Sequence, residues 1–251
     1  MALNDPNPYQ IPQADVTSLP LEGWHEPRSV RFSAGADWIT TAWRLFKSAP
    51  GIWILITLIT VACLMVASLI PFGSNLIVPL FMAGIYGAAQ RAYVGEAITV
   101  NDLFAGFRRQ ALQLLLLGVA STLIAFLLLA GMLGIFFYLS ALSTGATEGG
   151  AFLPQILFGL VLITAAFALT MATLYAPQLI YFEKMPILQA FKYSFLACWR
   201  NIASLTMFGI LTILMFILTL ITLGLGLLVV IPLLWIALYV SYYDIFVDNR
   251  P

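Results

Sequence analysis

Four long stretches without a charged residue constrain this chain more than any other feature of its sequence. They cover residues 48–90, 110–147, 149–182 and 201–243, which are 43, 38, 34 and 43 residues long. About 20 helical residues cross the roughly 30 Å hydrocarbon core of a membrane, because each residue adds about 1.5 Å. The chain is 62% hydrophobic and 9% charged, whereas soluble domains carry about 25% charged residues. This composition excludes a soluble globular protein and predicts an all-α polytopic membrane helical bundle.

We expect six transmembrane helices arranged as three hairpins. The breaks at 71–75 and 222–226 divide the first and last stretches, because helix breakers and turn residues belong at a membrane surface. Pro232 leaves an alternative open, since it could instead kink one continuous apolar helix. A polar loop around Glu148 joins the two middle stretches. The predicted spans are 51–70, 75–93, 112–139, 153–179, 202–221 and 226–243.

The positions of the basic residues predict that both chain ends lie in the cytoplasm. The three loops expected on the opposite side carry no Lys or Arg, whereas short cytoplasmic loops are rich in both. An odd number of spans would place Arg250 on the side opposite the cytoplasm. A single misplaced charge does not exclude that alternative. The basic residues on the expected cytoplasmic side are Arg28, Arg31, Arg44, Lys47, Arg91, Arg108, Arg109, Lys184, Lys192, Arg200 and Arg250.

An amphipathic segment precedes each pair of predicted spans. Residues 36–49, 99–109 and 186–200 gather apolar side chains on one helical face, which is typical of helices that lie at a membrane interface. Thr99 stands three residues before Asp102, and this spacing predicts a capping box. The recurring order of interfacial segment and two spans favours a threefold internal repeat. Ordinary aromatic and basic anchors on cytoplasmic flanks explain the pattern equally well.

Two further features concern packing and the chain start. Small residues such as Ala83 and Gly87, four positions apart in the second predicted span, let helix backbones approach closely and favour a compact bundle. Residues 1–33 contain five prolines without helical or alternating patterning. We expect them to form a disordered cytoplasmic tail, either simply solvated or able to bind a partner.

The sequence offers no candidate for catalytic chemistry. The four charge-free stretches hold no Asp, Glu, Lys, Arg or His, and ionisable groups at membrane depth usually mark a functional site. His25 is the only histidine and lies in the tail, so neither a metal cluster nor a histidine base is indicated. Cys63 and Cys198 are expected to remain free thiols. We therefore expect no enzyme activity, no metal and no cofactor.

Basic residues at the expected cytoplasmic surface are the remaining candidate site residues. Each can contribute about 1 kcal/mol toward anionic lipid headgroups. Membrane lipid is therefore the expected partner, a membrane-protein partner stays open, and zero net charge gives no indication of nucleic acid. The alternative is that these residues only set the topology. The candidate headgroup contacts are Arg44, Lys47, Arg108, Arg109, Lys192 and Arg200.

Four segments carry a family resemblance. Residues 38–47, 103–108, 191–198 and 241–246 resemble an uncharacterised family of six-span proteobacterial inner-membrane proteins. More distantly, the layout is similar to the membrane domain of some bacterial glycerophosphoryl diester phosphodiesterases, although no catalytic domain stands beside it here. The resemblance implies a six-helix transmembrane domain over residues 34–248 in a bacterial inner membrane. It transfers no functional residue.

Two functions fit these observations. The first is a non-enzymatic structural or accessory membrane protein, which needs no ionisable group at membrane depth. The second is a carrier or channel for a lipid or a small apolar solute, which also needs no buried charge. The sequence favours the structural or accessory role. It identifies neither a ligand nor a protein partner.

Overall fold

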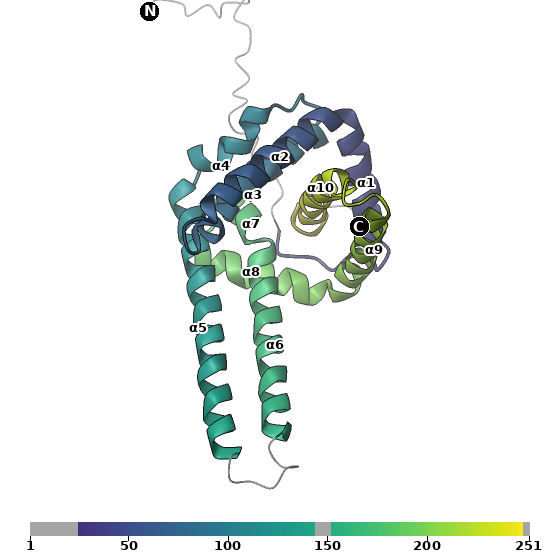
Figure 1. Cartoon of the computed structure of the whole chain (residues 1–251). Helices are drawn as coiled ribbons and strands as arrows, with labels where there is room; N and C mark the ends of the chain where they lie inside the picture. Colours follow the sequence, from purple (N-terminus) through teal and green to yellow (C-terminus); the bar gives the residue numbers. More distant parts are fainter. Residues whose placement is uncertain (1–24, 144–151, 248–251) are drawn as a thin grey trace, which may run out of the picture.

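The computed structural model describes residues 25–143 and 152–247, and every regular element in this part of the chain is a helix (Figure 1). The predicted all-α class is therefore confirmed for the described residues. In chain order the elements are α1 (Ala34–Ser48), α2 (Pro50–Ala67), α3 (Gly73–Tyr93), the 3-10 helix η1 (Val100–Phe104), α4 (Ala105–Arg108), α5 (Ala111–Ser143), α6 (Phe152–Leu174), α7 (Ala176–Glu183), α8 (Ile187–Arg200), α9 (Ile202–Ile221) and α10 (Leu227–Phe246).

Five helical segments are long and apolar enough to cross a membrane. They are Pro50–Ala67, Ala111–Tyr138, Ile156–Glu183, Ile202–Ile221 and Leu227–Phe246. The helix α3, which covers the second predicted span, is not among them. It carries Asn75, Pro79, Gln90 and Arg91 within its 21 residues, and much of it is surrounded by other helices. Since protein replaces lipid around α3, its side chains need not be apolar on every face.

The expected chain breaks separate distinct helices. Residues 68–72 form turns between α2 and α3, and residues 222–226 form turns between α9 and α10. The alternative in which Pro232 kinks one continuous helix is wrong, because Pro232 lies inside α10, well after the turn. At this turn Leu223 and Gly224 adopt positive φ, and the Thr222 hydroxyl accepts a hydrogen bond from the Gly226 amide. The side chain thereby satisfies one backbone donor at the start of α10.

The three amphipathic segments differ in length and helix type. Residues 36–49 and 186–200 correspond to α1 and α8, which are regular α-helices. Residues 99–109 instead form η1 followed by the single turn α4. The predicted capping box is confirmed, because the Thr99 amide donates to Asp102 Oδ2 at 2.7 Å and the reciprocal bond is also present.

Two glycines allow the segment η1–α4 to lie directly against α3. A Cβ at Gly84 would overlap the carbonyl oxygen of Leu103, and one at Gly106 would overlap the carbonyl oxygen of Leu80. Both obstacles are backbone atoms, which cannot rotate away as a side chain would. The short segment is therefore held against α3 by backbone proximity, consistent with the close packing predicted for the small residues of this span.

The predicted span 153–179 is interrupted at Tyr175, between α6 and α7. Pro177 follows the break, and a proline ring disrupts the preceding helical turn. The Ser194 hydroxyl of α8 occupies the gap: it donates to the Met171 carbonyl at 2.7 Å and accepts from the Tyr175 amide at 3.0 Å. A side chain inserted into the helical hydrogen-bond ladder is a recognised cause of a kink, and here it fastens α6 to α8.

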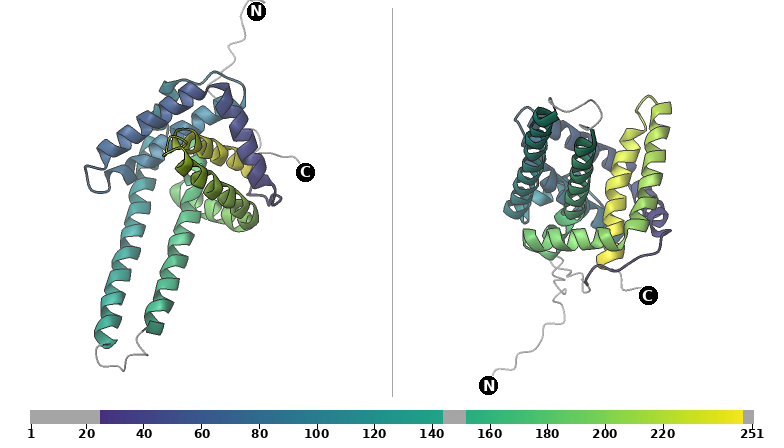
Figure 2. Two further views of the ribbon diagram at one scale, coloured as in Figure 1. Left: turned by 45° about the vertical axis from the view of Figure 1, so that its right-hand side comes forward. Right: turned by 90° about the horizontal axis from the view of Figure 1, so that it is seen from below.

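Helices α5 and α6 lie side by side and project together from the other helices (Figures 1 and 2). At their base they contact α8. In an 18-residue apolar stretch of Ile156–Glu183 only 6% of the residues are buried within the protein, compared with 56% in the corresponding stretch of Leu227–Phe246. The expected compact bundle is thus wrong for this pair, whose apolar side chains have too few protein neighbours to be covered.

Candidate functional site

The six basic candidates all have exposed side chains, but the structure does not bring all six together. Arg108 and Arg109, at the end of α4, line one pocket. Arg44 of α1 lines a second, larger pocket. Lys47, Lys192 and Arg200 line neither of these two. The predicted headgroup contacts therefore divide into pocket residues and residues on open helical surface.

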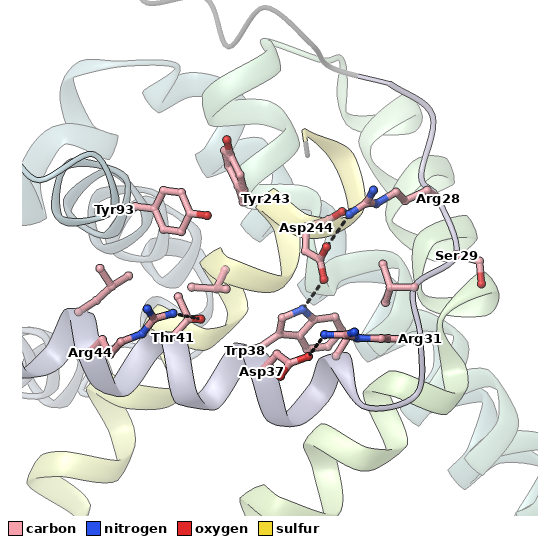
Figure 3. Close-up of a pocket in the computed structure, with 14 residues that line it drawn as sticks. Arg28, Ser29, Arg31, Asp37, Trp38, Thr41, Arg44, Tyr93, Tyr243 and Asp244 are labelled. Carbon is pink, nitrogen blue, oxygen red and sulfur yellow. Dashed lines mark hydrogen bonds and ion pairs between the residues drawn. The ribbon is translucent and has the colours of Figure 1, made fainter. Parts of the chain in front are cut away.

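The larger pocket, named here the Asp244 pocket, has a volume of about 890 Å³ (Figure 3). It lies between α1, the segment before α1 and the ends of α3 and α10. Both charged and aromatic side chains surround it. Its lining residues are Arg28, Ser29, Val30, Arg31, Ala34, Asp37, Trp38, Thr41, Arg44, Leu45, Tyr93, Val240, Tyr243 and Asp244.

The Asp244 carboxylate joins three parts of the chain within this pocket. Arg28 Nη2 donates to Asp244 Oδ1 at 2.7 Å, and the Trp38 indole nitrogen donates to Oδ2 at 2.8 Å. Arg28 Nε also donates to the Asp244 backbone oxygen at 2.7 Å. Figure 3 shows Arg28 and Trp38 approaching the carboxylate from different elements. Both carboxylate oxygens therefore accept strong donors, and this fixes the position of the side chain.

Residues 25–33 differ from the expected disordered tail. The amides of His25 and Arg28 donate to the carbonyl oxygens of Phe246 and Ile245, respectively. The segment adopts a defined path because these distant backbone groups, together with the Asp244 carboxylate, satisfy its own polar groups. Residues 1–24 of the predicted tail lie outside the described residues, and so does the predicted loop around Glu148.

The corner between α8 and α9 holds the same segment from its other side. Asn201 Oδ1 accepts from the Val30 amide at 2.8 Å, and Asn201 Nδ2 donates to the Arg28 carbonyl at 2.8 Å. Arg200 Nη1 donates to the buried Pro27 carbonyl at 2.7 Å. The guanidinium of Arg200 therefore has a structural partner, a role that its sequence position alone does not reveal.

Charges within the Asp244 pocket are largely compensated. Arg28 pairs with Asp244, and Arg31 pairs with Asp37 at 2.8 Å. Arg44 remains, and it donates to the Thr41 hydroxyl at 3.0 Å. The pocket thus has a single positive charge in excess of its ion pairs.

The smaller pocket, named here the Arg109 pocket, has a volume of about 310 Å³. Arg91 pairs there with Asp102 at 2.8 Å, and Arg108 donates to the Asn101 amide oxygen at 2.8 Å. In the part of the chain that the structure describes, neither Arg108 nor Arg109 pairs with a carboxylate. The lining residues are Gly87, Gln90, Arg91, Asn101, Asp102, Ala105, Arg108, Arg109 and Tyr181.

The two candidate lysines lie over aromatic rings. Lys47 Nζ is 5.8 Å from the centre of the Trp43 ring, and Lys192 Nζ is 5.6 Å from that of Tyr193. Such cation–π pairs combine an aromatic body with a charged tip, a pairing suited to the headgroup region of a membrane. Lys47 and Lys192 stay predicted headgroup contacts, on the exposed surfaces of α1 and α8.

The described residues hold no group of three or more His, Cys, Asp or Glu side chains arranged to bind a metal ion. Cys63 and Cys198 are both free thiols, and Cys198 is buried with its sulfur 3.5 Å from the Met171 carbonyl oxygen. Burial raises the pKa of Cys198 to about 12, so the reactive thiolate is scarce at neutral pH. This cysteine is suited to packing between α6 and α8.

Comparison with known proteins gives no further guide to the function. No family model, no curated protein and no solved structure matches the chain. The features of the chain that bear on its function are the exposed apolar helices and the two arginine-lined pockets.

Proposed function

We propose that the chain is a multi-pass protein of a bacterial inner membrane with a structural or accessory role and no catalytic activity. The observation that carries this proposal is the exposure of its long apolar helices. Each of four apolar segments contains an 18-residue stretch in which few residues are buried by protein: 22% in Pro50–Ala67, 17% in Ala111–Tyr138, 6% in Ile156–Glu183 and 11% in Ile202–Ile221. Apolar surface on this scale needs lipid or a protein partner to cover it.

Six crossings are supported by the length of α3 and by the contact between the segment before α1 and the end of α10. The 21 residues of α3 span about 30 Å, enough for one crossing. Residues 25–28 bond to the backbone of residues 245–246 at the end of α10. Segments joined by backbone hydrogen bonds lie on the same side of a membrane, so the chain between them makes an even number of crossings. Counting α3 as a span turns five into six, arranged as three hairpins.

A cytoplasmic location for both ends follows from the charge distribution. The described turns at 68–72 and 222–226 contain no charged residue, whereas Arg44, Arg109 and Lys192 belong to the opposite ends of the spans. Basic residues accumulate on the cytoplasmic side of inner-membrane proteins. The segment before α1, which bonds to the end of α10, carries Arg28 and Arg31, so it belongs to that side too.

An accessory role is favoured over ion-coupled transport because charged residues are confined to the ends of the spans. Glu183 and Asp244 lie at the last turns of α7 and α10, and both are hydrogen-bonded, Glu183 to the Tyr242 hydroxyl at 2.7 Å. Coupled transporters usually carry ionisable residues near the middle of the membrane. Glu183 and Asp244 therefore have a structural role, because their hydrogen bonds hold helix ends together.

The test is purification of the full chain in lipid nanodiscs, followed by mass spectrometry of everything retained. We expect a protein partner in fixed stoichiometry. The decisive counter-experiment is reconstitution into sealed liposomes: protein-dependent flux of a solute, or transfer of lipid between leaflets, would replace the accessory role by the carrier or channel alternative.

A further inference from the structure

Within the described residues, two arginines that line the Arg109 pocket have no ion pair, Arg108 and Arg109, whereas the Asp244 pocket has one such residue, Arg44. Three arginines line the Arg109 pocket, and Asp102 is the only carboxylate among its lining residues. Arg91 binds that carboxylate at 2.8 Å and also binds Glu96, which does not line the pocket, at 3.1 Å. We propose that the Arg109 pocket binds the phosphate group of an anionic membrane lipid, an inference that rests on the proposed membrane function and names its ligand class.

Donor chemistry suits a phosphate. Arg108 and Arg109 each present a planar fork of N–H groups that matches two phosphate oxygens. Gln90 and Asn101 add amide groups to the lining, and Tyr181 adds a hydroxyl. The volume of about 310 Å³ is at the lower end of the range of small-molecule pockets, which fits a compact headgroup.

The pocket walls are held in position by bonds of their own. Asn101 accepts the hydrogen bond from Arg108, and the Asp102 carboxylate holds both Arg91 and the Thr99 amide at the start of η1. Gly87 leaves room for Tyr181, since a Cβ there would stand 3.0 Å from the tyrosine hydroxyl oxygen. A site ordered before binding loses less side-chain entropy when the ligand arrives.

Position favours a lipid over a soluble phosphate. Helix α5 begins at Ala111, two residues after Arg109, and continues directly into a candidate membrane span. Its first turns expose Leu112, Leu115 and Leu116. A lipid whose phosphate occupies the pocket could lay its acyl chains along this apolar surface, whereas a soluble phosphate gains nothing from it. The positive end of the α5 dipole also lies close to Arg109.

The experiment titrates phosphatidylglycerol into full-length protein held in phosphatidylcholine nanodiscs and counts bound lipid by native mass spectrometry. Arg108→Gln with Arg109→Gln should weaken phosphatidylglycerol binding about 30-fold, as expected for two arginines near an anionic headgroup. Lys47→Gln with Lys192→Gln removes the same charge from headgroup candidates that do not line this pocket, so it measures the general attraction of anionic lipid and should weaken binding clearly less than the arginine variant does. Arg108→Lys with Arg109→Lys keeps the charge but removes the planar fork of donors, so it should recover only part of the binding that the glutamine variant loses.

Three results would overturn the lipid site. The arginine and lysine variants could lose binding equally, which would show a general charge effect. The arginine variant could bind as the unchanged protein does. In a separate titration, inorganic phosphate could occupy the pocket without being displaced by phosphatidylglycerol, which would assign the site to a soluble anion. None of these results touches the proposed accessory role, which is tested by partner retention and liposome flux.

Discussion

At the scale of single residues, Asp244 connects the start of the described chain with its end. It receives Arg28 from the segment before α1 and Trp38 from α1, although both lie more than 200 residues away. Trp38 is buried, whereas the side chains of Arg28 and Asp244 are 27% and 26% exposed. A partly buried carboxylate with two charge-assisted or directed donors contributes more than an exposed ion pair does.

We expect Asp244→Asn to lower the free energy of unfolding by about 2 kcal/mol, because Arg28 loses its charged acceptor while remaining partly buried. Asp37→Asn is the matched control. Its ion pair with Arg31 is exposed, with side-chain exposures of 55% and 76%, and should contribute less than about 0.5 kcal/mol. Denaturant titration in detergent measures both variants. Equal destabilisation would contradict the central position given to Asp244.

Cys198 provides a test of burial between α6 and α8. Burial raises its thiol pKa from the ordinary 9.0 to about 12. Because the thiolate is the reacting species, folded Cys198 should be alkylated at pH 8 roughly 1000-fold more slowly than in denatured protein. Between pH 9.0 and about 12 the unfolded chain releases a proton that the folded chain keeps, so this group's contribution to stability falls as pH rises. Iodoacetamide labelling of a Cys63→Ser variant measures the rate, and rapid labelling in the folded state would contradict this burial.

At the scale of elements, the contact between α3 and η1–α4 depends on the missing side chain of Gly84. We expect Gly84→Ala to destabilise the protein by about 1–3 kcal/mol, since its Cβ would meet the Leu103 carbonyl. Gly131→Ala in α5 is the control, because a Cβ there has open space and alanine favours a helix. It should leave stability unchanged or raise it slightly. Thermal unfolding followed by circular dichroism distinguishes the two, and similar unfolding temperatures would refute the close approach.

The elements could be predicted from the sequence where local chemistry decides them. The turns at 68–72 and 222–226, the ranges of α9 and α10 and the capping box at Thr99 all follow from residue types within a few positions. The break at Tyr175 could not be predicted as easily, because its missing hydrogen bonds are supplied by Ser194 from another helix. Pro177 was the local signal for it.

The candidate site was predictable in its charges but not in its geometry. Arg108 and Arg109 stand out as adjacent basic residues before an apolar stretch. Their separation from Arg44, and the engagement of Arg200 by Pro27, depend on how distant segments fold against one another. Asp244 gave one usable signal, an acidic residue directly after the last charge-free stretch, but its partners Arg28 and Trp38 could not be deduced from spacing.

At the scale of the whole molecule, the contact between the two described chain ends limits the ways in which the chain can cross a membrane. The amides of His25 and Arg28 reach the last turn of α10, so any arrangement with five crossings would have to pull these segments apart. Five candidate spans therefore disagree with these hydrogen bonds. The disagreement disappears if α3 is a sixth crossing whose surface is mostly covered by protein. Its buried residues run from Pro79 to Ala89, through the middle of the helix.

Cysteine accessibility separates six crossings from five. The variants are made in a background with Cys63→Ser and Cys198→Ser. We expect Asn75→Cys and Leu223→Cys to react with a membrane-impermeant maleimide added to intact spheroplasts. Asn75 is exposed in the first turn of α3 and Leu223 in the turn before α10, and both positions belong to the side of the membrane opposite the basic residues. Gln189→Cys on α8 and Gly95→Cys after α3 should react only once the membrane is permeabilised. Labelling of Gly95→Cys from outside would mean that α3 does not cross, and the hydrogen bonds between residues 25–28 and 245–246 would then be incompatible with the topology.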